Sequence, residues 1–346
     1  MVGIMPSLDL LQIDLTEECP LFCGHCSNSS GPSNTTRFPL QKLIEIIDQA
    51  GKMDVKALVL SGGEPLCYPG LRAALKRAQT LKLPVTICTT GIRDKKTRSP
   101  IESSEWKNLK QDGLVTAAFS IYAAPEQREF HNQIVMLKPL SGDAFGANET
   151  AMRRARAAGM DVQAHLIPSD SSIADLQDIY DWAVSLECSV LHLQIPTQQG
   201  RNATSPRLAM NQCQEEALQR LASSLLTVSG TTFHVSRLWY QRWSGANFNC
   251  GANERQLIIR ADGTISPCNA CKYSTARDQQ GNILNPTGNL KAVWESSPTL
   301  QAYRSAKARN SVCKRCQGIF AEYKQEENLS QRSTLLPEVR ADGMFS

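Results

Sequence analysis

The stretch Cys19-Pro-Leu-Phe-Cys23-Gly-His-Cys26 decides how the rest of this sequence is interpreted. It follows Leu8 to Leu15, an apolar run that predicts a first buried strand. Three thiols within eight residues of one loop cannot all point into a hydrophobic core, so a metal site explains them best. Zinc prefers four ligands and usually takes paired C-x2-C units, whereas a cluster held by three cysteines leaves one iron open for a ligand. The spacing therefore favours an iron–sulfur cluster, with zinc as the alternative.

The composition is that of a globular protein with no signal for export or membrane insertion. Of the 346 residues, 41% are hydrophobic, yet no apolar run approaches the roughly 18 residues of a membrane-spanning helix. The N-terminus lacks the basic-then-apolar order of a secretory signal. A net charge of +4 is too small to indicate nucleic-acid binding. We therefore expect a cytoplasmic protein that binds neither membranes nor nucleic acid.

The cysteine content is high for a protein of this kind. There are twelve cysteines but only five histidines, so sites made of thiolates are favoured over mixed cysteine–histidine zinc sites. Disulfide frameworks belong mostly to short secreted domains. The C-x2-C and C-x3-C spacings therefore indicate metal ligation in a reducing compartment.

Apolar runs alternate with helical patterns through the first two thirds of the chain. The expected strands cover residues 8–15, 55–60, 85–88, 114–121, 162–167 and 190–195. Six strands separated by helices are typical of parallel βα units, and we expect an α/β fold, a partial (βα)6 barrel of the TIM type. The cysteine loop, Gly62–Pro65 and the segment after Ile121 all follow the carboxyl ends of expected strands, where barrels of this type carry their chemistry.

The pattern changes near Gly230, where we expect a domain boundary. Residues 1–230 would form the partial barrel, residues 231–323 a small β-hairpin and helix extension, and residues 324–346 a polar tail. The turn Ala261-Asp-Gly263 predicts the tip of the hairpin.

The spacing of Cys19, Cys23 and Cys26 resembles the signature of the radical S-adenosylmethionine (SAM) enzymes. The resemblance implies that these cysteines hold a [4Fe–4S] cluster whose fourth iron binds SAM. It further implies that one electron, from a donor such as flavodoxin or ferredoxin, releases a 5′-deoxyadenosyl radical that takes a hydrogen atom from the substrate. In such enzymes the cofactors carry the chemistry, while the protein positions and shields them.

Several other segments resemble elements of the same family. Gly62-Gly-Glu-Pro65 resembles the segment that binds the SAM amino group: Gly62 and Gly63 allow close approach of the backbone, and Glu64 can accept from an ammonium. Ser120 resembles the serine that contacts the SAM ribose or carboxylate. It leads into His131-Asn132, where asparagine replaces the usual aspartate.

Three further residues have less specific interpretations. Arg201, after the sixth strand, suits a carboxylate of SAM or substrate, with a structural salt bridge as the alternative. His165 and His192 fall inside expected strands, and we interpret them as packed residues rather than ligands.

The remaining cysteines form a second pattern, C-x12-G-x4-C followed by a distant C-x2-C. It resembles the twitch extension, a short form of the SPASM domain, and implies one auxiliary [4Fe–4S] cluster, with zinc as the alternative. Full ligation by four cysteines favours electron transfer over substrate binding. Cys271 would be spare. The implied ligands are Cys250, Cys268, Cys313 and Cys316.

The resemblance implies a radical SAM oxidoreductase without fixing its substrate. The Ser-Ile-Tyr-Ala segment at Ser120 is similar to maturases of ribosomally made peptides, which favours peptide modification in natural-product biosynthesis. We expect no leader-recognition domain ahead of the first strand. A dehydrogenase or epimerase of a small molecule, such as an aminocyclitol or sugar, is the alternative. A non-catalytic metal-stabilised binding protein is the second alternative, and it predicts bound zinc and no SAM cleavage.

Overall fold

The computed structural model describes most of the chain up to Arg304. The described residues are 7–135, 142–169, 173, 175–197, 199–203, 211–226, 231–236, 255–269, 282–285, 288–301 and 304. Four cysteines of the expected extension, Cys250, Cys271, Cys313 and Cys316, lie outside them, as does the expected tail. No helix in this described part is both long and apolar enough to cross a bilayer.

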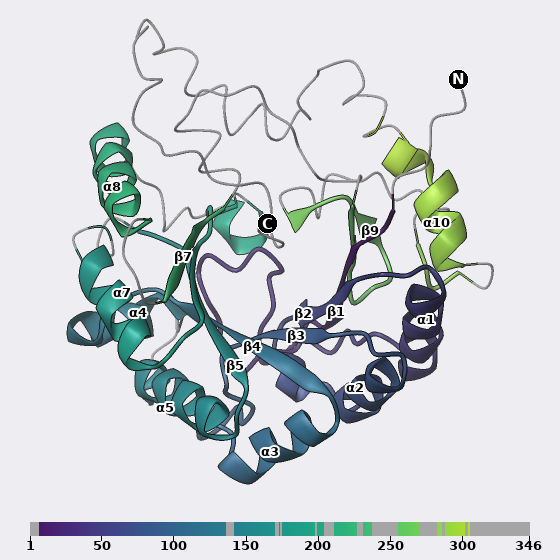
Figure 1. The fold of residues 1–346 in the computed structure, drawn as a ribbon, viewed down its shortest axis with the longest axis horizontal. Helices are drawn as coiled ribbons and strands as arrows, with labels where there is room; N and C mark the ends of the chain where they lie inside the picture. Colours follow the sequence, from purple (N-terminus) through teal and green to yellow (C-terminus); the bar gives the residue numbers. More distant parts are fainter. Residues whose placement is uncertain are drawn as a thin grey trace, which may run out of the picture.

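In the described part of the chain, one curved sheet of nine strands organises the fold (Figure 1). Its order is β7-β6-β5-β4-β3-β2-β1-β8-β9. All neighbours pair in parallel except β8 and β9, which are antiparallel. The strands are β1 (Leu10–Thr16), β2 (Ala57–Gly62), β3 (Val85–Thr89), β4 (Leu114–Ile121), β5 (Asp161–Leu166), β6 (Val190–Leu193), β7 (Thr232–Val235), β8 (Gln256–Ile259) and β9 (Ile265–Ser266).

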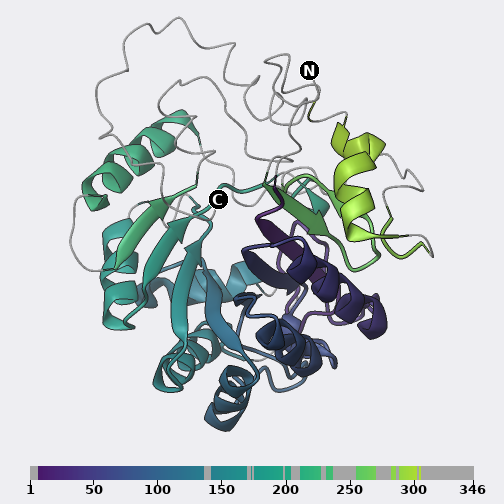
Figure 2. The same cartoon turned by 45° about the vertical axis from the view of Figure 1, so that its right-hand side comes forward.

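Helices cover the outer face of this sheet, and the loop after β1 lies inside its curve (Figures 1 and 2). Among the described residues, three short 3-10 turns accompany them: η1 (Pro65–Cys67), η2 (Pro125–Gln127) and η3 (Gly200–Ala203). The described α-helices are α1 (Leu40–Lys52), α2 (Leu71–Thr80), α3 (Ser103–Gln111), α4 (Arg128–Val135), α5 (Ala144–Ala157), α7 (Leu176–Ser185), α8 (Gln212–Leu225) and α10 (Leu290–Ser296).

The alternation of side chains along each strand separates a core face from an inward face. On β5, Val162, Ala164 and Leu166 are buried in the main hydrophobic core together with residues of α5 and α7. Gln163 and His165, between them, point to the other side of the sheet, because successive side chains of a strand face opposite ways. The loop that carries the three cysteines leaves the carboxyl end of β1 and lies on this inward side, within the curve of the sheet (Figure 1).

All six expected strands are confirmed, and the sheet extends beyond them at both edges. β7 continues it past β6, and β8 pairs with β1 in parallel, with Leu11 opposite Leu257. The domain boundary expected at residue 230 stays a prediction. Two strands that follow it, β7 and β8, lie on opposite sides of the six expected strands in the same sheet. The expected hairpin is confirmed: Gly263 has a φ of +81° at the turn between β8 and β9.

The pairing of β8 with β1 generates a stability prediction. Leu257→Ala should lower the free energy of unfolding by about 2–5 kcal/mol, because Leu257 is fully buried in the main core. Val115→Ala on β4 removes a side chain that is 49% exposed and should change stability by less than about 0.5 kcal/mol. Urea unfolding followed by circular dichroism measures both, and equal midpoint shifts would contradict the prediction.

Candidate metal centre and cofactor site

The three N-terminal cysteines lie in the loop that leaves the carboxyl end of β1. Cys19 is buried, Cys23 and Cys26 are partly buried, and none of the three is in a disulfide. The C-terminal end of α4 holds the loop from one side: Phe22 N donates to Val135 O and Gly24 N to Ile134 O, both at 3.1 Å. Carbonyls at a helix end have no partner inside the helix, so the loop satisfies them while α4 fixes its path.

Arg201 holds the same loop from the other side. Its Nε donates to the carbonyl of Cys23 at 2.7 Å, and its Nη2 donates to the carbonyl of Ser30 at 2.6 Å. The guanidinium also lies 4.0 Å from the ring centroid of Phe22. A planar fork with several donors is suited to bridging two such acceptors. Arg201 was expected to bind a carboxylate. In this structure it binds backbone carbonyls of the cysteine loop.

Gly200 makes this close approach of Arg201 possible. It has a φ of +56°, and a Cβ built on it would lie 2.4 Å from Cys26 O and 2.6 Å from Ser27 O. The amide of Arg201 donates to Cys26 O at 3.1 Å. Only glycine combines this backbone conformation with that contact.

The Gly62–Pro65 loop lies directly against the residues that precede Cys19. Gly63 N donates to Thr16 O at 2.6 Å, and Glu64 N donates to Glu18 O at 2.8 Å. A Cβ on Gly63 would lie 2.2 Å from Glu18 O. The expected meeting of the two loops at the sheet edge is thus present, with backbone packed on backbone. Pro65, the last residue of this loop, is buried and is the first residue of η1.

Glu64 is completely buried and satisfied by its own chain. Its Oε1 accepts from Leu66 N (3.1 Å) and from Thr89 Oγ1 (2.5 Å). Its Oε2 accepts from the amide and hydroxyl of Thr90 at 2.8 and 2.7 Å. Burial raises the pKa of the carboxyl, against the lowering effect of these donors. A carboxylate offers about four acceptor sites, and four donors of the chain already occupy those of Glu64. Glu64 therefore positions its loop, and a hydrogen bond from the SAM ammonium to Glu64 stays a prediction.

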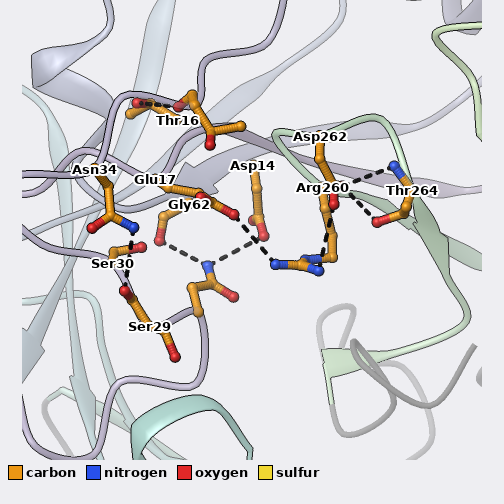
Figure 3. A network of polar contacts seen from close by, with 12 residues as sticks. Asp14, Thr16, Glu17, Ser29, Ser30, Asn34, Gly62, Arg260, Asp262 and Thr264 are labelled. Atoms are coloured by element: carbon orange, nitrogen blue, oxygen red, sulfur yellow. Dashed lines mark hydrogen bonds and ion pairs between the residues drawn. The ribbon is translucent and has the colours of Figure 1, made fainter.

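A second polar network ties β1, the cysteine loop and the β8–β9 hairpin together (Figure 3). Asn28 Nδ2 donates to Asp14 Oδ2 at 3.2 Å and to Gly62 O at 2.8 Å. Arg260, directly after β8, reaches Glu17 Oε1 at 3.5 Å. The hairpin is therefore joined by an ion pair to the segment that leads into Cys19.

Burial makes two of the three thiols, Cys19 and Cys23, hard to ionise, and a bound cationic centre would relieve this. Burial, and then the neighbouring Cys23, raise the pKa of the Cys19 thiol well above its usual range. Burial, and then Cys26, raise the pKa of Cys23 to about 12. Buried thiols this close together resist ionisation on their own. Bound iron would offset that cost, since a metal deprotonates the thiols that coordinate it.

Unpartnered polar atoms beside the loop also fit a bound group. Nδ1 of His25 and Oγ of Ser30 are buried and find no hydrogen-bond partner among the described residues. Buried polar groups are normally paired in native proteins. The amide of Ser30 donates to Sγ of Cys26 at 3.4 Å, a contact of the kind that tunes iron–sulfur clusters.

The arrangement favours a cluster over a single zinc ion. Across the described ranges, no three histidine, cysteine or acidic side chains lie close enough to share one metal ion. In a [4Fe–4S] cluster each cysteine binds a different iron, so its ligands need not converge on one point. The structure describes Cys268 after β9 but not the other expected ligands of the auxiliary cluster, so that ligand set stays a prediction.

The end of β4 and the segment after it hold three expected site residues: Ser120 stays a candidate, whereas His131 and Asn132 have structural contacts. Ser120 is partly buried on the inward face near the end of β4, and its carbonyl accepts from Asn148 Nδ2 at 3.4 Å. His131 is buried between the rings of Tyr122 and Phe145. Asn132 accepts from Phe145 N at 2.9 Å. His131 and Asn132 thus shape the start of α5, and Ser120 alone of the three stays a candidate SAM contact.

Sequence reasoning missed three residues that fix the site. Asn28 bridges Asp14 to Gly62; Gly200 makes room for the cysteine loop; Asn148 ties the ends of β3 and β4 through the carbonyls of Thr90 and Ser120. The local sequence offers a signal for Gly200, because a glycine directly before Arg201 is typical of a tight backbone. It does not indicate that the cysteine loop is the segment in contact.

Comparisons with known proteins agree with this geometry. Residues 13–183 match the model of the Radical SAM superfamily, and residues 250–317 match SPASM, described as an iron-sulfur cluster-binding domain. The PqqA peptide cyclase of Streptomyces rochei is 24% identical over 326 residues, which cover 90% of this chain and 82% of that protein. The PqqA peptide cyclase of Ruegeria pomeroyi is 24% identical over 332 residues, with coverage of 92% and 82%.

Solved structures share the fold at lower identity. Streptococcus suis SuiB bound to precursor peptide SuiA gives a TM-score of 0.67 at 17% identity and covers 86% of this chain and 67% of that one. Native anSMEcpe with bound AdoMet gives 0.64 at 15% identity, with coverage of 90% and 87%. These likenesses confirm an α/β fold of the expected barrel type with a C-terminal extension.

The contact of Gly200 with the cysteine loop can be tested directly. Gly200→Ala should cost about 1–3 kcal/mol of backbone strain and also displace Cys26, so that reconstituted protein retains less iron. Gly142→Ala is the matched control, because Gly142 also has a positive φ but a Cβ there would meet nothing closer than 3.9 Å. Iron analysis measures both variants. Equal iron content would show that the close approach does not hold the loop.

Proposed function

Because this chain belongs to the radical SAM superfamily and carries a C-terminal SPASM iron–sulfur domain, we propose that it oxidises a ribosomally made peptide. The observation that carries the proposal is the buried triplet Cys19, Cys23 and Cys26 at the end of β1, packed against Gly62–Pro65. The peptide cyclases similar to it over about nine tenths of the chain favour a peptide as the substrate. The enzyme class itself follows from the family.

The residues around the triplet have distinct parts in this function. Cys19, Cys23 and Cys26 would hold the cluster, and Gly62 and Gly63 would present backbone to SAM. When bound, cluster and SAM supply a 5′-deoxyadenosyl radical that removes a hydrogen atom from the substrate. The chain itself fixes the loop through Arg201 and Glu64 and excludes water through the packing of Tyr122, Ile134 and Val135 around Cys19 and Leu21.

One auxiliary cluster, held by Cys250, Cys268, Cys313 and Cys316, would accept the electron that an oxidised substrate radical must lose. The position of Cys268 supports this part of the proposal. The next residue, Asn269, accepts from Gln199 through its carbonyl at 2.8 Å and exchanges side-chain hydrogen bonds with Gln12 on β1. Cys268 therefore lies at the same sheet edge as the loop that Arg201 clamps.

The proposal includes a cytoplasmic location and an external electron donor such as flavodoxin or ferredoxin. Reduced iron–sulfur clusters and free thiols persist in reducing compartments. A low-potential protein donor of this kind would reduce the first cluster.

The peptide substrate is tested with synthetic peptides covering the short reading frames beside the gene. Reconstituted enzyme, reductant and SAM should convert one of them to a product lighter by two hydrogen atoms, measured by mass spectrometry. Conversion of an aminocyclitol or sugar with every peptide unchanged would overturn the proposal.

The auxiliary cluster is tested with Cys268→Ser. Two clusters predict about eight irons per chain, and the variant should retain about four. It should still form 5′-deoxyadenosine but release no oxidised peptide, since the electron has no outlet. Cys213→Ser is the matched control, because Cys213 is exposed on α8 and lacks ligand spacing. Wild-type iron content in the Cys268 variant would contradict the assignment.

A further inference from the structure

Three of the five histidines form a row with Ser120 across four neighbouring strands. Cα pairing places Ser120 opposite His165, His165 opposite His192, and His192 opposite His234. Each is the next-to-last residue of its strand. The imidazole centroids lie 5.2 Å apart from β5 to β6 and 6.4 Å apart from β6 to β7. We call these four residues the histidine row.

The histidine row faces inward at the edge where the cysteine loop lies. The residues on either side of two of its histidines, Ala164 and Leu166 on β5 and Leu191 and Leu193 on β6, belong to the core under the helices. Since side chains alternate along a strand, the histidines point the other way, toward the inner face of the sheet, whose curvature Figure 1 shows. His192 is buried, whereas His165 and His234 are only partly buried, so solvent reaches the row at these two histidines.

The histidine row begins close to the metal centre. Ser120 lies two residues before Tyr122, and the ring centroid of Tyr122 lies 4.5 Å from that of His25, in the cysteine loop. From there the row crosses β5 and β6 and ends on β7. A molecule bound along it would have one end beside the site where hydrogen is removed.

The row offers uncharged hydrogen-bonding groups. Burial lowers the pKa of His165 to about 4 and that of His192 to about 3, and it also lowers the pKa of His234. Nδ1 of His165 lies 3.0 Å from the amide nitrogen of Gln194. The amide donates there, so the proton of the neutral ring lies on Nε2, which is free to donate. A neutral imidazole carries one donor and one acceptor.

The surrounding inward positions do not suit an anionic ligand. On β5, β6 and β7 they hold Asp161, Gln163, Val190 and Thr232 besides the histidines, with no lysine or arginine among them. A carboxylate or phosphate here would lose its hydration without gaining a cationic partner. An amide group, which both donates and accepts, matches the row.

The length of the row matches a short extended segment. Four neighbouring strands place Ser120 and His234 roughly 14 Å apart, at about 4.8 Å per strand spacing. About four extended residues cover that distance. A single sugar or cyclitol ring would reach only part of it.

We propose that the histidine row is the substrate-binding wall of this enzyme and takes an extended, uncharged stretch of about four peptide residues through hydrogen bonds to its amide groups. This inference rests on the proposed peptide substrate and adds which part of it is recognised and by which residues. The histidines act by binding, so their contacts are present in ground state and transition state alike. Their loss should therefore raise KM and leave kcat unchanged.

The test uses the iron-loaded enzyme and the synthetic peptide that the wild type converts. His192→Leu should raise KM for that peptide about tenfold, the effect of about one good hydrogen bond, with kcat unchanged. His192→Asn keeps a neutral donor and acceptor and should stay within about threefold of wild type. Gln163→Leu is the matched control, because Gln163 lies on the same inward face of β5 but one layer further from the cysteine loop.

Two further readouts separate binding from folding and from the proposed function. Iron content and 5′-deoxyadenosine formation without peptide should match the wild type in all three variants. An unchanged KM in His192→Leu, or an equal rise in Gln163→Leu, would overturn the histidine row as the binding wall. A wild-type enzyme that converts no peptide overturns the proposed function itself, and the peptide assignment of the row with it.

Discussion

Backbone packed against backbone at the carboxyl edge of the sheet is the constraint on which this structure depends. The loop with Cys19, Cys23 and Cys26 is held between two other loops, and glycines occupy both contacts. Gly63 meets Glu18 O and Gly200 meets Cys26 O at distances that leave no room for a Cβ. These contacts fix main-chain atoms of the loop, and so they set the path along which the three thiols are presented.

The same edge brings together residues that are far apart in sequence. Arg201 bonds to Cys23 across 178 residues, and Asn269 bonds to Gln12 across 257 residues. The first contact fixes the metal loop, and the second joins the segment after β9 to β1. Together with the inward histidines, they place a metal centre, an expected electron outlet and a binding wall around one end of the barrel.

The buried strands and the cysteine motif could be predicted, because both depend on short stretches of sequence. Strands buried on both faces read as apolar runs, so Val55–Leu60 and Val190–Ile195 were recognisable, and the cysteine spacing was sufficient for the family. β7 and β8 were missed as parts of the main sheet because each has four residues. Arg201 was expected to meet a carboxylate, since no spacing rule names a backbone partner in three dimensions.

The histidines show the same limit more clearly. His165 and His192 were interpreted as packed because each lies in an apolar run. An apolar run does not distinguish the face under the helices from the face inside the barrel. Only the register of β4 to β7 shows that Ser120 and the histidines share one inward layer.

The central claim is that Cys19, Cys23 and Cys26 hold a cluster that cleaves SAM. The direct measurement is 5′-deoxyadenosine formed by reconstituted, dithionite-reduced protein with SAM under anaerobic conditions. The wild type and Cys213→Ala should form it, and the variant with all three cysteines replaced by alanine should form none. An iron-loaded wild type that forms none, or a triple variant that forms as much as the wild type, would contradict the account.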